Sequence, residues 1–117
     1  MTHVLIVDDE PLLREELQES LELEDFEVTT ATSVPDALEK LEQDRVDAVV
    51  TDLKMPKLGG LELIRQLQAD GFEGTVVVVS GHGAQSSRDD AMSMGATACF
   101  AKPLDTDDLI DVLRPEG

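Results

Sequence analysis

The chain has 117 residues, which predicts a single domain over residues 1–117, with one hydrophobic core and no room for a separate output module. Apolar residues make up 41% of it, which argues against disorder, and no apolar run approaches the roughly 20 residues of a membrane-spanning helix. The 26 acidic residues outnumber the 9 basic ones, and the formal net charge of −17 disfavours binding to nucleic acid or to an anionic membrane.

The first half of the chain alternates short apolar runs with segments of helical periodicity. Residues 4–7 form a run typical of a strand buried on both faces, and Pro11 suits the first position of a helix. That helix is predicted by leucines at a spacing of four, namely Leu13, Leu17 and Leu21. Residues 26–31 predict a second strand, and Ser33 with Asp36 three positions later predicts the capped start of a second helix.

The second half repeats this alternation. Residues 46–51 predict a third strand that ends at Asp52, and apolar residues at helical spacing then predict a helix that contains Leu61, Ile64 and Leu67. The remaining predicted elements are a strand at residues 76–79, a helix at residues 85–94, a strand at residues 98–101 and a last helix at residues 105–113.

Five strands that alternate with five helices predict an α/β fold with a parallel sheet covered on both faces, because parallel neighbours need crossover connections. In such doubly wound sheets, ligands bind beyond the carboxyl ends of the strands, where the strand order reverses. The polar residues that follow the predicted strands are therefore the candidates for a functional site.

Polar side chains occupy the end of nearly every predicted strand: Asp8, Asp9, Asp52, Ser80 and Lys102. Each one alone is an ordinary turn, cap or strand-exit residue, but their joint occurrence in this order points to a site. Three carboxylates at one sheet edge repel one another unless a cation neutralises them, and oxygen ligands favour Mg²⁺ over zinc. The lysine and the hydroxyl add donors for anionic oxygens, so the set suits phosphoryl transfer.

Four motifs carry a resemblance to a known family: Val7-Asp8-Asp9-Glu10, Thr51-Asp52-Leu53-Lys54-Met55-Pro56, Ser80-Gly81, and Gly95-Ala96 leading into Lys102-Pro103. Over essentially its whole length the chain resembles the receiver domains of bacterial response regulators, which serve two-component signalling. The resemblance implies a flavodoxin-like three-layer sandwich with strand order 2-1-3-4-5. It also implies a cytoplasmic domain, which fits a single cysteine and the absence of a basic leader before the first apolar run.

The resemblance implies a role for each motif residue. Asp52 would be the phospho-acceptor, and Asp9, Asp52 and the backbone carbonyl of Lys54 would ligate Mg²⁺ directly, with Asp8 held through water. Glu10 is expected to face solvent.

Around the phosphoryl group, Lys102 would contact one oxygen and Ser80 would move to donate a hydrogen bond to another. The partners would be a histidine kinase or histidine phosphotransfer protein and an output domain or effector. Because the domain would act only on itself, it would not be an enzyme. The chain is either complete in itself or part of a longer regulator, and the sequence leaves both open.

The sequence departs from the family pattern at one position. An aromatic residue usually lies three positions before the strand-exit lysine, where this chain has Cys99. Phe100 is adjacent, but neighbours on a strand point to opposite faces, so it is not expected to replace the aromatic. Lys54 and His82, each two positions beyond a key residue, are expected to tune the lifetime of an aspartyl phosphate.

Three other functions compete with this interpretation. A flavin or nucleotide binder would need a Gly-rich or Ser/Thr-rich loop after the first strand, where this chain has three acids. An aspartate-nucleophile phosphatase resembles this chemistry but places its nucleophile on the first strand. A receiver-like module that binds partners without phosphorylation usually lacks one of the key residues; it is the hardest alternative to exclude.

Overall fold

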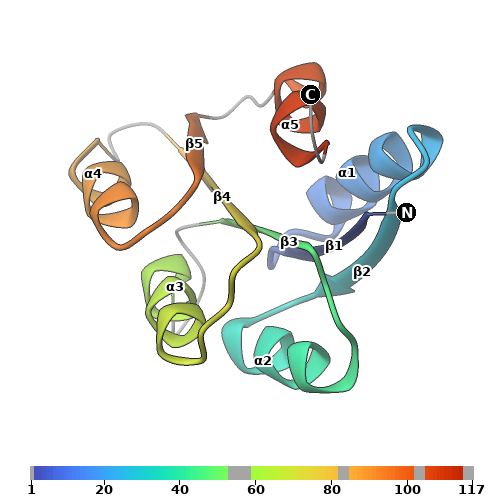
Figure 1. Cartoon of the computed structure of the whole chain (residues 1–117). Helices are drawn as coiled ribbons and strands as arrows, with labels where there is room; N and C mark the ends of the chain where they lie inside the picture. Colours follow the sequence, from blue (N-terminus) through green and yellow to red (C-terminus); the bar gives the residue numbers. More distant parts are fainter. Residues whose placement is uncertain (1, 53–58, 82–84, 102–104, 115–117) are drawn as a thin grey trace.

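The computed structural model describes residues 2–52, 59–81, 85–101 and 105–114, which form ten alternating strands and helices (Figure 1). The strands are β1 His3–Val7, β2 Glu27–Ala31, β3 Ala48–Asp52, β4 Thr75–Ser80 and β5 Ala98–Ala101. The helices are α1 Pro11–Leu23, α2 Val34–Gln43, α3 Gly60–Ala69, α4 Gln85–Ser93 and α5 Thr106–Leu113. None of these helices combines the length and the apolar character needed to cross a bilayer.

The five strands form one parallel sheet in the order β2-β1-β3-β4-β5, which confirms the predicted fold class and strand order. Helices α1 and α5 cover one face, and α2, α3 and α4 cover the other, so the molecule has three layers (Figure 1). The strand order reverses between β1 and β3, because β1 is followed by β2 on one side and by β3 on the other. The carboxyl ends of β1 and β3 therefore meet at the switch point where ligands bind in such sheets.

The core divides into two clusters because successive side chains of a strand point to opposite faces. In β1, Leu5 and Val7 pack toward α2 and α3, whereas Val4 and Ile6 pack toward α1 and α5. Every strand of the sheet interior contributes to both clusters in this way, which explains why residues 4–7 and 76–79 are continuous apolar runs rather than alternating ones.

Residues at or next to the first turn set the starts of the helices. Those of α1 and α2 lie where the sequence predicted them, and that of α5 lies one residue later. Pro11 lies at the first position of α1, where its missing N–H leaves no hydrogen bond unmade. The Ser33 hydroxyl caps α2 by accepting from the backbone N–H of Asp36 at 3.2 Å. Asp105, expected as the first helical residue, is instead the N-cap of α5 and accepts from the N–H of Asp107 at 2.9 Å.

Several strand boundaries differ from the sequence prediction by one or two residues, and those of β3 and β4 bear on the site. β3 begins at Ala48 rather than at residue 46, because Val46 and Asp47 form a lead-in that is tied to the start of β1. The Asp47 N–H donates to the His3 carbonyl at 2.7 Å, and the Asp47 carboxylate accepts from the His3 N–H at 2.9 Å. Ser80, predicted as the first residue of a loop, is the last residue of β4 and is therefore held by the sheet.

We predict that Gly74→Ala destabilises the domain by about 2–4 kcal/mol, because a methyl group at residue 74 would overlap the backbone carbonyl of Asp47 and the ring of Phe72. Gly71→Ala is the matched control: Gly71 has φ +75° but open space around its α-carbon, so only backbone strain of about 1 kcal/mol is expected. Urea unfolding followed by circular dichroism measures both, and equal losses would show that the close approach at Gly74 has no cost of its own.

Candidate functional site

The buried polar residues gather at the carboxyl edge of the sheet. Among the residues that the structure describes, the buried polar or charged ones are Asp8, Thr51, Asp52 and Ser80, with exposed fractions of 3%, 0%, 5% and 1%. Asp8 directly follows β1, Thr51 and Asp52 end β3, and Ser80 ends β4. Burying a carboxylate is costly unless it is paired or binds a cation, so this gathering identifies the functional edge of the fold.

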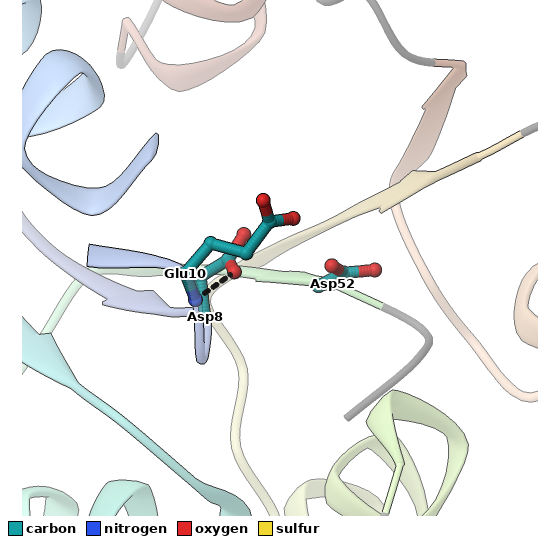
Figure 2. Close-up of side chains that lie close together, drawn as sticks. All are labelled: Asp8, Glu10 and Asp52. Atoms are coloured by element: carbon teal, nitrogen blue, oxygen red, sulfur yellow. Dashed lines mark hydrogen bonds between the residues drawn. The ribbon is translucent and has the colours of Figure 1, made fainter. Parts of the chain in front are cut away.

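Three carboxylates converge at this edge (Figure 2). Asp8, Glu10 and Asp52 each offer one oxygen, and these oxygens lie within 4.8 Å of one another. At that separation, two ionised carboxylates repel by roughly 3 kcal/mol if the effective dielectric constant is about 20. A divalent cation relieves that repulsion, and an oxygen-only ligand set suits a hard cation such as Mg²⁺.

Backbone contacts hold Asp8 and Glu10 in this arrangement. The Glu10 N–H donates to Asp8 Oδ1 at 2.8 Å, the bond drawn as a dashed line in Figure 2. The Asp8 N–H donates to the Ala31 carbonyl at 3.1 Å, and Arg14 Nη1 donates to the Asp8 carbonyl at 2.8 Å. Asp8 is thus anchored both to β2 and to the first turn of α1, so its carboxylate is fixed before any ligand binds.

Glu10 is exposed, as expected from the sequence, and its carboxylate also belongs to the group formed with Asp8 and Asp52, which the sequence analysis did not predict. The Asp8 side chain closes a turn by accepting from the Glu10 N–H, and α1 begins immediately after Glu10; these two features fix the position of Glu10 next to the end of β1. Asp9, expected as a direct ligand, is exposed and not a member of this group; its role as a metal ligand stays a prediction.

Other candidate residues lie outside the described residues. Lys54, whose carbonyl was expected to ligate the metal, His82 and Lys102 all belong to the segments at 53–58, 82–84 and 102–104. Their predicted roles remain predictions.

The two buried hydroxyls at this edge differ in their hydrogen bonding. Thr51 Oγ1 donates to the Asp52 carbonyl at 3.0 Å, whereas Ser80 Oγ has no hydrogen-bond partner among the described residues. A buried hydroxyl without a partner costs free energy, about 1–3 kcal/mol. The Ser80 hydroxyl could therefore donate a hydrogen bond to a new acceptor, and it lies on β4, the strand next to the one that carries Asp52.

The side chains of β5 confirm the expected alternation. Cys99 packs against the cluster under α2, α3 and α4, and Phe100 packs against the cluster under α1 and α5. Phe100 therefore lies on the opposite face of the sheet from Cys99 and does not substitute for an aromatic residue at that position. The register pairs Ser80 with Ala101 and Val78 with Cys99.

The family model of the response regulator receiver domain matches residues 4–114. The chain belongs to the response regulator receiver domain family. Among its relatives, the response regulator MprA of Mycolicibacterium vanbaalenii is 35% identical over 111 residues, which are 95% of this chain and 48% of the relative. MprA of Mycobacterium leprae is also 35% identical, over 95% of this chain and 49% of its own length. This receiver domain thus spans about half the length of these relatives.

Solved structures agree with this assignment. The receiver domain protein from Clostridium thermocellum superposes with a TM-score of 0.92 at 30% identity, over 97% of this chain and 91% of that one. FixJ-N superposes with a TM-score of 0.88 at 32% identity, over 96% of this chain and 90% of FixJ-N. Chemotaxis protein CheY4 of Vibrio cholerae superposes with a TM-score of 0.87 at 26% identity, over 97% of this chain and 96% of CheY4. Receiver domains are signalling domains of two-component response regulators, and accepting a phosphoryl group is their standard function.

We predict opposite effects of removing the two buried hydroxyls from the resting domain. Ser80→Ala should leave the free energy of unfolding unchanged or raise it by about 1 kcal/mol, because the hydroxyl that it removes has no hydrogen-bond partner among the described residues. Thr51→Val, which removes a hydroxyl of equal burial that is hydrogen-bonded, should lower it by about 1 kcal/mol. Urea unfolding measures the change in the free energy of unfolding for each variant. Equal destabilisation by both substitutions would mean that the Ser80 hydroxyl has a hydrogen-bond partner in solution.

Proposed function

We propose that this receiver domain accepts a phosphoryl group on the carboxylate of Asp52, with Mg²⁺ bound at the acidic edge of the sheet. The observation that carries the proposal is the position of Asp52: it is buried at the end of the central strand β3, with the carboxylates of Asp8 and Glu10 converging on it. The donor would be a phosphohistidine of a histidine kinase or of a histidine phosphotransfer protein, in keeping with the response regulator relatives.

The chemistry follows from the charges. An oxygen of Asp52 attacks phosphorus and the phosphorus–nitrogen bond of the donor histidine breaks. The electron pair of that bond stays on the ring nitrogen, and the imidazole, already protonated at its other nitrogen, leaves as the neutral base. The nucleophile and the phosphoryl group are both anionic, so the reaction needs positive charge at the site. Mg²⁺ held by the acidic residues of this edge would supply part of that charge. Lys102, three positions beyond Cys99, would supply the second positive charge by contacting another phosphoryl oxygen.

Mg²⁺ would be held by Asp52, by Asp9 and by the Lys54 carbonyl, with Asp8 acting through water as the family resemblance implies. The group of three carboxylates adds Glu10 to this set, since its oxygen, like that of Asp8, lies within 4.8 Å of the Asp52 oxygen. Mg²⁺ usually keeps several water ligands, so carboxylates at this distance can act through its waters rather than by direct coordination.

The signal would be a change in the position of Ser80. Its hydroxyl has no partner among the described residues, and a phosphoryl group on Asp52 brings new acceptor oxygens to the adjacent strand end. Donation to one of them pulls the end of β4 toward the acceptor and moves the chain between β4 and α4. The domain acts on itself, in phosphorylation and in later hydrolysis, and is not an enzyme with a separate substrate.

The signal would pass to an output domain of the same chain or to a separate effector protein. We propose that the domain itself contacts neither nucleic acid nor membrane, since its formal net charge of −17 repels both. We propose that the domain works in the cytoplasm, where its partners are proteins, and that its boundaries are those expected from the sequence, residues 1–117.

Phosphorylation by a small donor tests the acceptor. Incubation with acetyl phosphate and Mg²⁺ should add one phosphoryl group by intact-mass spectrometry, and Asp52→Asn should abolish it, because an amide cannot form the acyl phosphate. Asp111→Asn, a change of the same type at an exposed residue of α5, should label like the natural protein. Labelling that persists in Asp52→Asn would assign the acceptor to another residue.

Calorimetric titration tests the metal ligands, since the chain has no Trp or Tyr to report binding by fluorescence. We expect Glu10→Gln to weaken Mg²⁺ binding about three- to tenfold, because one carboxylate near a divalent cation is lost. Asp9→Asn should weaken it more, if Asp9 is a direct ligand. Glu15→Gln, at an exposed residue one turn into α1, is the matched control and should change the affinity less than twofold. An unchanged affinity in Glu10→Gln would remove Glu10 from the cation site.

A further inference from the structure

A groove lies at the edge of the sheet opposite Asp52, where β3 and β4 begin. Its walls are the C-terminal ends of α2 and α3, which lie side by side on one face of the sheet (Figure 1). The volume is about 1100 Å³. That exceeds the range of about 300–1000 Å³ typical of small-molecule pockets and suits a segment of polypeptide.

The floor of the groove is apolar. Val46 and Leu67 are buried beneath it, and three half-buried side chains line it: Leu38 and Leu41 from α2 and Phe72 from the loop after α3. Since these three side chains retain accessible surface, they can lose more of it to an apolar partner. Burial of that surface favours association at about 25 cal/mol per Å² before the costs of binding.

The rim of the groove is acidic. Five exposed carboxylates surround it against one guanidinium, that of Arg45; the acidic residues are Glu42, Asp44, Asp47, Asp70 and Glu73. The two helix ends add to this field: α2 stops at Gln43 and α3 at Ala69, and a helix C-terminus carries partial negative charge. The last turn of α2 contains one basic residue, Lys40, and the last turn of α3 has none.

The groove is held in shape before anything binds. His3 ties the acidic loop to β1: its N–H donates to Asp47 Oδ2 at 2.9 Å, and its ring Nδ1 lies 2.9 Å from the Arg45 carbonyl, to which it donates. The Asp47 carbonyl accepts from the Thr75 N–H at 3.1 Å and leaves no space for a side chain at Gly74. A preformed surface lowers the ordering cost of association.

We infer that this groove docks a basic amphipathic helix of a partner protein, with its apolar residues on the floor and its Lys or Arg side chains at the rim. Charge complementarity selects this occupant, because five carboxylates and two helix C-termini face one cation. A second copy of the chain is disfavoured, since each copy carries a net charge of −17. The groove is remote from Asp52, so this docking is independent of the proposed phosphoryl transfer.

The test uses a synthetic 14-residue peptide of leucine and lysine at helical spacing, titrated calorimetrically against matched charge reversals. The groove variant carries Glu42→Lys and Glu73→Lys together. The control variant carries Glu15→Lys and Glu19→Lys on the exposed face of α1, which changes the net charge by the same amount. We expect the groove variant to lose at least about tenfold in affinity and the α1 variant less than about threefold, because only the first removes charges next to the peptide. Equal losses would show attraction to net charge alone and would overturn the inference.

Two further measurements complete the test. Amide shifts induced by the peptide should fall on residues 38–47 and 66–74, and shifts centred on α1 would contradict the inference. A peptide with serine in place of leucine should not bind measurably, and undiminished binding would show that the apolar floor is not used. Asp52→Asn should bind the leucine–lysine peptide as the natural protein does, so failure of the groove and failure of the acceptor assignment are distinguishable.

Discussion

The burial of Asp8 and Asp52 at the switch point of the sheet is the constraint on which the rest of the structure depends. Two carboxylates that are 3% and 5% exposed stand where a core would otherwise place apolar side chains. The Glu10 N–H offsets part of that cost by donating to the Asp8 carboxylate, and a cation bound by these acids would offset more of it. The two apolar clusters on either side of the sheet supply the stability that tolerates such a site.

This constraint explains the contrast between the two ends of the sheet. At the carboxyl end, charge is buried and anchored to backbone, which suits chemistry that needs fixed oxygens. At the other end, charge lies on an exposed rim around half-buried apolar side chains, which suits recognition of a partner. The acidic excess of the composition therefore serves two different purposes at opposite edges, besides forming a hydrated surface.

The position of Cys99 bears on how a change at Asp52 could reach the rest of the domain. Ser80 and Cys99 belong to neighbouring strands, β4 and β5, and Cys99 packs on the face covered by α2, α3 and α4. A thiol is smaller than the aromatic ring usual at this position in the family, so under the proposed movement of Ser80 we expect Cys99 to displace less of the packing on this face than an aromatic ring would.

The sequence by itself determined the element types, their order and the residues at the strand ends. Period-two and period-3.6 patterns are local, and Ser33, Pro11 and the four-valine run of β4 act within a few residues of their own positions. It also placed Cys99 and Phe100 on opposite faces, because strand alternation needs no tertiary information. The strand order came from the family resemblance, since handedness rules alone leave several topologies.

Only the tertiary structure decided that, of the Asp8-Asp9-Glu10 run, the carboxylates of Asp8 and Glu10 group with that of Asp52. Three adjacent carboxylates are equivalent in composition, and their directions depend on the turn closed by the Asp8 side chain and on where α1 begins. The environment of the Ser80 hydroxyl, which has no hydrogen-bond partner in the part of the chain that the structure describes, is also tertiary, as is the groove between α2 and α3, because each depends on residues distant in the sequence. Local patterns specify whether each segment forms a helix or a strand. Which side chains come into contact depends on how the crossover connections bring the strand ends together.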